Sequence, residues 1–242
     1  MRITDKIPSD WRDLEYKVAD ILNEARYNTV VNKEIETVRG NVHIDVYAED
    51  AISNPKSIFL IECKYWSSDI PQTVVHSFRT IVNDFGANYG LIIAKNKFQS
   101  GCYEAIKNTN VSLLNWFEFL DLFENRWLNS VLDHLDSLSA PLREYTDPLD
   151  VNEKYDLLTQ EGKKQYQKLC TEYVGYSLYS SRFLYEFETG TKDINKVHID
   201  RVIKKAIESG LISAEITCYK DYFNFLKLKC IEGIRLFQEL LN

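Results

Sequence analysis

The chain has 242 residues, 45% of them apolar, which is enough to bury the core of one large domain or of two modest ones. Its 29 basic and 36 acidic residues give a formal net charge of -7, the wrong sign for a protein that coats nucleic acid nonspecifically, although a nuclease that carries positive charge as bound metal can be acidic overall. No apolar run approaches the roughly 20 residues of a membrane span, and the N-terminus lacks the apolar region of a signal peptide, so we expect a cytoplasmic protein.

The first half of the chain alternates between helical and strand patterns. Apolar residues recur at helical spacing behind a Ser9 or Asp10 cap, and later segments are short, apolar and rich in β-branched residues. In chain order we predict helix Ser9–Tyr27, strands Thr29–Val38 and Asn41–Ala48 with a turn at Arg39-Gly40, strand Ser57–Trp66, helix Pro71–Phe85, strand Tyr89–Ala94, helix Gln99–Asn108, strand Val111–Leu114 and helix Trp116–Trp127. This order predicts an α/β sandwich with a mixed sheet, antiparallel at first and later connected through helices.

The pattern changes after Ser130. Residues Leu138–Asp150 contain two of the five prolines, so we predict a first domain at 1–130, a linker at 131–150 and a mostly α-helical C-terminal domain at 151–242. The expected helices of the last domain are Glu153–Tyr173, Tyr176–Glu188, Ile194–Ser209 and Tyr219–Leu241. Tyrosines are dense there, and at this spacing they indicate core or interface packing rather than chemistry.

One group of charged residues indicates chemistry. Asp45 lies on one predicted strand, and Glu62 and Lys64 lie two apart on the next, so that pair points to one face of the sheet. Two carboxylates supply the hard oxygen ligands that Mg²⁺ prefers, and the ammonium can stabilise charge on a phosphate or orient water. The alternative is an ordinary Glu62–Lys64 ion pair at a sheet rim. The pair interrupts the apolar run IFLIECKYW, however, and buried charges are costly unless they are paired or bound to metal.

These residues resemble the PD-(D/E)XK nuclease superfamily, in which D…(D/E)-x-K lies on a β-hairpin of an α/β core. The stretch that follows, DFGANYGLIIAKNKFQSGCYEAIKNTNVSLLNW, resembles the catalytic domain of Mrr-type restriction endonucleases. The resemblance covers about the first half of the chain and ends near Trp127. It implies a restriction-endonuclease-like sheet flanked by helices. The matching positions outside the motif are Gly86-Ala87, Gly90, Phe98, Ala105 and Val111.

The resemblance implies a role for each motif residue. Asp45 and Glu62 would be ligands of Mg²⁺, for which Mn²⁺ can substitute, and the backbone carbonyl of Cys63 would be a further ligand. Lys64 would be the catalytic lysine, and Glu15 on the first helix would bind the metal directly or through water. The chain departs from the commonest pattern because His43-Ile44, rather than a proline, precedes Asp45.

Other polar residues are weaker candidates. Glu15 itself could be an ordinary exposed helix charge, like Asp13 and Asp20. His43 shares the strand face of Asp45, and Gln72 begins the helix after the motif, where such domains often place a polar residue near the phosphate. The remaining candidates for packing or phosphate contact are His76, Arg79, Lys95, Lys97 and Lys107.

The leading hypothesis is a Mg²⁺-dependent endonuclease that cuts double-stranded DNA, in restriction or anti-phage defence. The alternatives are a nuclease-fold binding or assembly subunit whose cleavage is absent or gated by a partner, and a nuclease acting on RNA or branched DNA. A homodimer or a partner protein from a defence system is expected, because a double-strand cut by one site per chain usually needs two copies. The five cysteines are scattered and never form C-x-x-C, which argues against disulfides and a zinc site.

Overall fold

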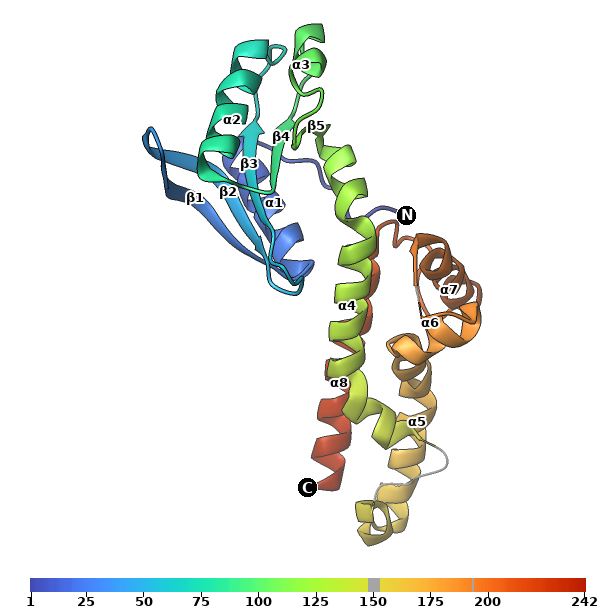
Figure 1. Ribbon diagram of the computed structural model, residues 1–242. Coiled ribbons are helices and arrows are strands. Elements are labelled where there is room, and N and C mark those ends of the chain that lie inside the picture. The colour runs from blue at the N-terminus through green and yellow to red at the C-terminus, as the bar shows by residue number, and fades with distance from the viewer. Residues whose placement is uncertain (148–152, 193) are drawn as a thin grey trace. The chain divides into compact units, whose positions relative to one another are not determined.

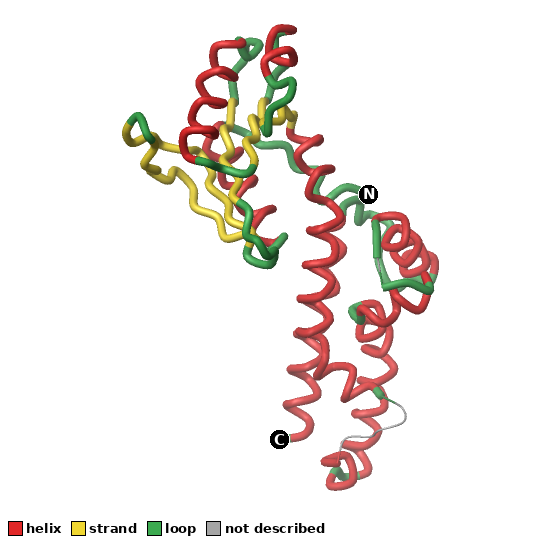
Figure 2. Tube along the Cα trace, in the orientation of Figure 1, coloured by secondary structure: helices red, strands yellow, loops and turns green. Residues whose placement is uncertain are grey.

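The computed structural model describes residues 1–147, 153–192 and 194–242. The chain divides into two compact units: a sheet unit, Lys6–Trp127, and a helical unit made of Met1–Asp5 and Leu128–Asn242. Figure 2 shows that the described strands all belong to the sheet unit, while the described residues of the helical unit form helices and loops. None of the described helices is both long and apolar enough to cross a membrane.

The sheet unit contains one mixed sheet of five strands in the order β1-β2-β3-β4-β5. β1 and β2, and β2 and β3, pair antiparallel, whereas β3, β4 and β5 pair parallel. The elements are α1 (Trp11–Glu24), β1 (Tyr27–Thr37), β2 (Gly40–Asp50), β3 (Ile58–Lys64), α2 (Gln72–Phe85), β4 (Tyr89–Ala94), α3 (Ser100–Ala105), β5 (Val111–Asn115) and the first part of α4 (Trp116–Thr146). All nine elements predicted up to Trp127 are present, and the predicted change from antiparallel to parallel pairing is confirmed.

Helices cover the sheet on both faces (Figure 1). α1 begins at the side-chain cap of Asp10, whose carboxylate accepts the Asp13 N–H at 2.9 Å, and it packs its apolar stripe against β1, β2 and β3. α2 follows Pro71 and ends at Gly86, whose φ of +76° suits a residue without a side chain. The buried residues of α2 join one apolar core with the inner positions of the strands and of α3.

The side chain of Arg126 ties α4 to the ends of α1 and β2 inside the sheet unit. Its guanidinium donates two hydrogen bonds to the buried carboxylate of Asp50, at 2.6 and 2.7 Å, and one to the Ala25 carbonyl at 2.8 Å. It also lies 3.8 Å from the ring centre of Tyr27. Because the fork of an arginine matches a carboxylate in two places, this contact fixes direction as well as position.

The helical unit has its own core. Its elements are the second part of α4, the 3₁₀ turn η1 (Glu153–Leu157), α5 (Gln160–Tyr179), α6 (Arg182–Thr189), α7 (Lys196–Glu208) and α8 (Tyr219–Leu241). Tyr166, Tyr173 and Phe237 are buried together between α5 and α8, and the hydroxyls of Tyr185 and Tyr222 lie 2.9 Å apart in the interior. The expectation that tyrosines pack in the core is therefore confirmed for these residues.

Two predictions for the second half were wrong. Residues 131–146, expected in a linker, are helical, because α4 continues to Thr146 with Pro141 inside it; residues 148–150 of the expected linker lie outside the described residues. Leu128, Leu132, Leu135 and Leu142 are all buried at helical spacing, so burial outweighs the hydrogen bond that the proline cannot make.

The expected helix Glu153–Tyr173 is instead the short turn η1 followed by α5, which runs to Tyr179 and so includes the residue, Tyr176, where the next helix was expected to begin. Caps decide these boundaries. Thr159 accepts the Gly162 N–H at 3.1 Å and begins α5, and Ser181 caps α6.

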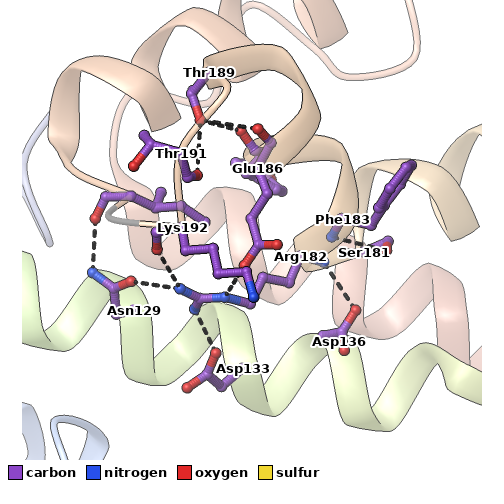
Figure 3. Close-up of polar contacts among 12 residues, drawn as sticks. Asn129, Asp133, Asp136, Ser181, Arg182, Phe183, Glu186, Thr189, Thr191 and Lys192 are labelled. Atoms are coloured by element: carbon purple, nitrogen blue, oxygen red, sulfur yellow. Dashed lines mark hydrogen bonds and ion pairs between the residues drawn. The ribbon is translucent and has the colours of Figure 1, made fainter.

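Arg182, at the start of α6, links that helix to α4 within the helical unit (Figure 3). Its guanidinium contacts the carboxylate of Asp133 at 2.5 Å, that of Glu186 at 3.0 Å and the side-chain oxygen of Asn129 at 3.2 Å. Its backbone N–H donates to Asp136 at 2.9 Å. Each donor therefore has an acceptor on α4 or α6, which makes this a structural network rather than a binding site.

Candidate functional site

Asp45 lies on β2 at the point where the pairing with β3 ends. The residue pairs of the two strands run from Glu49↔Ile58 to Val46↔Ile61 and stop there. One step further, the Oδ2 atom of Asp45 accepts the backbone N–H of Cys63 at 2.7 Å. The side chain thus takes the place of a backbone acceptor and is held between the two strands as they separate.

Glu62 and Lys64 follow on β3 and form an ion pair with each other. The side chain of Glu62 is 19% exposed and that of Lys64 is 16% exposed, so the pair is shielded from most solvent and still reachable. Burial, and next the carboxylate of Asp45, raise the pKa of Glu62, while the ammonium of Lys64 opposes them. The prediction that these charges interrupt an apolar strand is confirmed by the burial of Leu60 and Ile61 just before them.

Glu15 on α1 belongs to the same electrostatic group. The buried neighbours Leu14 and Val18 set the rotation of the helix on the sheet. The pKa of Glu15 is raised to about 7, chiefly by burial and then by the carboxylates of Asp45 and Glu62. An exposed helix carboxylate would not show this shift, so the structure favours the reading of Glu15 as part of the cluster.

The donor set fits a hard divalent cation in its chemistry. Three carboxylates lie around the ammonium of Lys64, and burial, followed by repulsion between these carboxylates, raises the pKa values of Glu15 and Glu62. The thiol of Cys63 is buried with a pKa raised well above its usual value, so only its backbone oxygen is a reasonable ligand. Within the described residues no three acidic, histidine or cysteine side chains are arranged as a ready metal site.

The weaker candidates lie in different places. His43 is exposed on β2, and Lys107 pairs with Glu104 at 2.7 Å. Gln72 has its side-chain amide beside Gly101 of α3, where an added Cβ would meet its Oε1 at 2.8 Å.

Two other candidates line a cavity. His76 and Arg79, together with Arg39, lie on a polar cavity of about 640 Å³ beside α2. Arg39 is itself paired with Asp84 at 2.7 Å, so one of these cations is already compensated.

Lys95 is the weaker candidate closest to the motif. Its backbone N–H donates to the carbonyl of Lys64 at 2.9 Å, and its ammonium lies 4.1 Å from the ring centre of Tyr65. Lys97 is exposed; its backbone carbonyl accepts the Ile70 N–H at 2.9 Å, and its backbone N–H donates to Asn96 Oδ1 at 2.9 Å.

Sequence reasoning missed the aromatic residues beside the motif. Tyr65 and Trp66 follow Lys64 directly, and the ammonium of Lys64 lies 5.7 Å from the ring centre of Trp66. Two aromatic residues immediately after E-x-K were the available signal. The sequence pattern places both residues at the end of a buried strand. In the structure β3 ends at Lys64, and Trp66 is 41% exposed.

A mixed sheet that presents an aspartate from one strand and a Glu-x-Lys pair from the next, with a helix carboxylate beside them, defines the class of PD-(D/E)XK nucleases. Residues 8–123 match the Mrr catalytic-domain family, described as restriction endonuclease. This segment is a Mrr-type restriction endonuclease catalytic domain.

Comparisons beyond the family add little. No curated protein matches the sequence. Among solved structures, the crystal structure of a protein of unknown function, AF1548, is similar with a TM-score of 0.40 and 14% sequence identity, over 93% of this chain and 99% of that one. A likeness of that size supports no argument about this chain.

Proposed function

We propose that this protein is a Mg²⁺-dependent endonuclease that hydrolyses phosphodiester bonds in DNA, with Asp45, Glu62, Glu15 and Lys64 as its catalytic group. The observation that carries the proposal is the concentration of three carboxylates around one lysine at the splayed end of β2 and β3, with a pKa of about 7 for Glu15. A protein does not gather uncompensated charge in this way for stability alone. The family of residues 8–123 supports DNA as the substrate.

Asp45, Glu62 and the Cys63 carbonyl would hold the cation, with Glu15 contributing directly or through water; Mn²⁺ can substitute for Mg²⁺. A bound divalent cation supplies Lewis-acid polarisation of a phosphoryl oxygen and lowers the pKa of water.

The residues of the chain do the remaining work. The Nζ atom of Lys64, released from Glu62 when that carboxylate takes a new partner, is free to bind a phosphate oxygen or to orient the attacking water. The hydrogen bond from Cys63 keeps Asp45 in place while charges around it change. At a pKa of about 7, the carboxyl of Glu15 can hold or release a proton near neutral pH.

The test is cleavage of plasmid DNA by purified protein in Mg²⁺ or Mn²⁺. We expect Glu62→Gln and Lys64→Met to lose at least about a hundredfold in rate, because each removes charge from the site. Glu104→Gln is the matched control, since that glutamate forms an exposed ion pair on α3. If the wild-type protein cleaves no DNA with either metal, or if the two site variants cleave as fast as the control, the proposal fails.

A second candidate is a conditionally active subunit whose cleavage a partner protein gates. It is favoured by the existing contacts of the two motif carboxylates, because Glu62 is paired with Lys64 and Asp45 with the Cys63 amide. Metal binding must then compete with contacts inside the protein. Isothermal titration with Mn²⁺ tests this reading: millimolar or undetectable binding by the isolated protein, together with a stable co-purifying partner that restores cleavage, would favour it over the first.

A further inference from the structure

The surface beside the catalytic group contains a cavity of about 320 Å³, which we call the Tyr65 cavity. Its walls come from α1 and the segment before it, from the residue after β3, from the ends of β4 and β5 and from the start of α4. The lining residues that matter here are Leu14, Tyr65, Lys95, Trp116 and Phe117. The size falls at the lower end of the roughly 300–1,000 Å³ of small-molecule sites, and most of the lining is apolar or aromatic.

The Tyr65 cavity adjoins the catalytic residues through the chain itself. Tyr65 directly follows Lys64, and Leu14 directly precedes Glu15. Tyr65 is held by a hydrogen bond from its hydroxyl to the Pro8 carbonyl at 3.2 Å and by the ammonium of Lys95 over its ring. Two lining residues of the cavity are therefore covalent neighbours of catalytic candidates, although none of the four candidates lines the cavity itself.

The chemistry of the walls selects a flat, partly polar ligand. Trp116 and Phe117 give the cavity aromatic walls, and the Tyr65 ring lies opposite a cation, the ammonium of Lys95. Aromatic side chains stack on planar rings. Lys95 adds an exposed cation at the rim. A nucleobase with its attached phosphate offers all of these partners.

Two exposed tryptophans lie close in sequence to the catalytic candidates. Trp66, two residues after Lys64, is 41% exposed, and Trp11, one helical turn before Glu15, is 53% exposed. Large exposed rings beside a nuclease site are suited to stacking on bases that lack a partner strand. A base inside a duplex is stacked and paired, so it cannot enter a cavity without being extruded.

We propose that the Tyr65 cavity receives an unpaired nucleobase next to the scissile phosphate, so that the preferred substrate is single-stranded or locally unpaired nucleic acid. This inference rests on the proposed nuclease function and specifies its substrate.

The test is binding of a fluorescein-labelled 12-mer, as a single strand and as the duplex of the same sequence, followed by anisotropy in EDTA. We expect the wild-type protein to bind the single strand about tenfold more tightly than the duplex. Tyr65→Leu should weaken single-strand binding about tenfold and leave duplex binding unchanged, whereas Tyr65→Phe, which keeps the ring, should stay within about twofold of wild type. Equal affinity for both forms, or no loss in Tyr65→Leu, would overturn the inference.

Two further measurements separate stacking from a general loss of structure. Tyr89→Leu removes a 48% exposed tyrosine at the opposite end of the β3–β4 pair, where Tyr89 pairs with Phe59, and should bind as wild type. An abasic 12-mer should lower wild-type affinity about as much as Tyr65→Leu does, with no further loss when the two are combined. If Tyr65→Leu does not fold, Trp66→Ala at an exposed position takes its place with an expected loss of several-fold.

A separate measurement, the rate of DNA cleavage in Mg²⁺, tests the proposed nuclease function independently of the cavity. Cleavage of duplex and single strand at equal rates, with Tyr65→Leu as active as wild type, would reject the base cavity and leave the nuclease intact. Selective single-strand binding without cleavage would reject the nuclease and support the cavity. Absence of both binding and cleavage would reject both proposals.

Discussion

Replacing Arg126 with methionine should destabilise the sheet unit, because it leaves the buried carboxylate of Asp50 without its positively charged partner. The substitution keeps the aliphatic stem and removes the two hydrogen bonds to Asp50, at 2.6 and 2.7 Å, and the contact with the Tyr27 ring. The side chain of Asp50 is 4% exposed in the intact structure, so the arginine is its main source of charge compensation.

The expected magnitude follows from the remaining partners of Asp50. Breaking a buried ion pair by removing one member costs about 3–5 kcal/mol. Asp50 retains the N–H groups of Ile52 and Ser53, at 2.9 and 3.1 Å, and the Ser53 hydroxyl at 2.6 Å. Because three donors still stabilise the carboxylate, we expect the lower limit, about 3 kcal/mol.

Urea denaturation followed by tryptophan fluorescence measures this loss, because all four tryptophans lie in the sheet unit. Asp50→Asn and the double variant complete a thermodynamic cycle, in which the double variant should be less destabilised than the sum of the single ones. A loss below about 1 kcal/mol for Arg126→Met, or strictly additive effects, would refute the assignment of stability to this pair.

The same pair predicts a dependence on pH. The guanidinium of Arg126, followed by the donors of Ser53 and Ile52, holds the pKa of Asp50 well below its usual range. A depressed pKa in the folded state stabilises the protein above the unfolded pKa, about 4, and the stabilisation is lost as pH falls toward the folded value. The difference in stability between wild type and Arg126→Met should therefore be largest at neutral pH and shrink below about pH 4.

Three further predictions concern the site and its support. The pKa of Glu15 is about 7 in the folded protein and about 4.3 in the unfolded chain, so ionisation of Glu15 destabilises the fold as the pH rises between these values. In EDTA, Glu15→Gln should therefore raise the melting temperature more at pH 8 than at pH 5. The opposite order would contradict the raised pKa. Gly90→Ala would place a Cβ 2.7 Å from Val82 Cγ2 and should cost about 1–3 kcal/mol in urea denaturation, whereas Gly101→Ala meets only a flexible side-chain end and should cost much less. Added Mn²⁺ should raise the melting temperature of wild type but not of Glu62→Gln, and equal shifts would argue against that ligand.

The sequence determined the sheet unit because its signals are local. Turn residues, caps and apolar periods specify the order of the nine elements, and the two-residue spacing of Glu62 and Lys64 places both on one face of β3. Gly90 is one of the positions that match the family, and the structure explains why it is a glycine: Val82 and Phe78 of α2 leave no room for a side chain. Neighbours in sequence were sufficient for these conclusions.

Tertiary structure decided what depends on residues far apart in the chain. The expected linker became helix because Leu132 and Leu142 find buried partners, which outweighs the local effect of Pro141. The electrostatic coupling of Glu15 to Asp45 and Glu62 arises only because packing brings α1 beside the strands, where burial raises the pKa of Glu15. The Tyr65 cavity is formed by segments more than a hundred residues apart at their extremes, from Ile7 to Phe117, so no spacing in the sequence could reveal it.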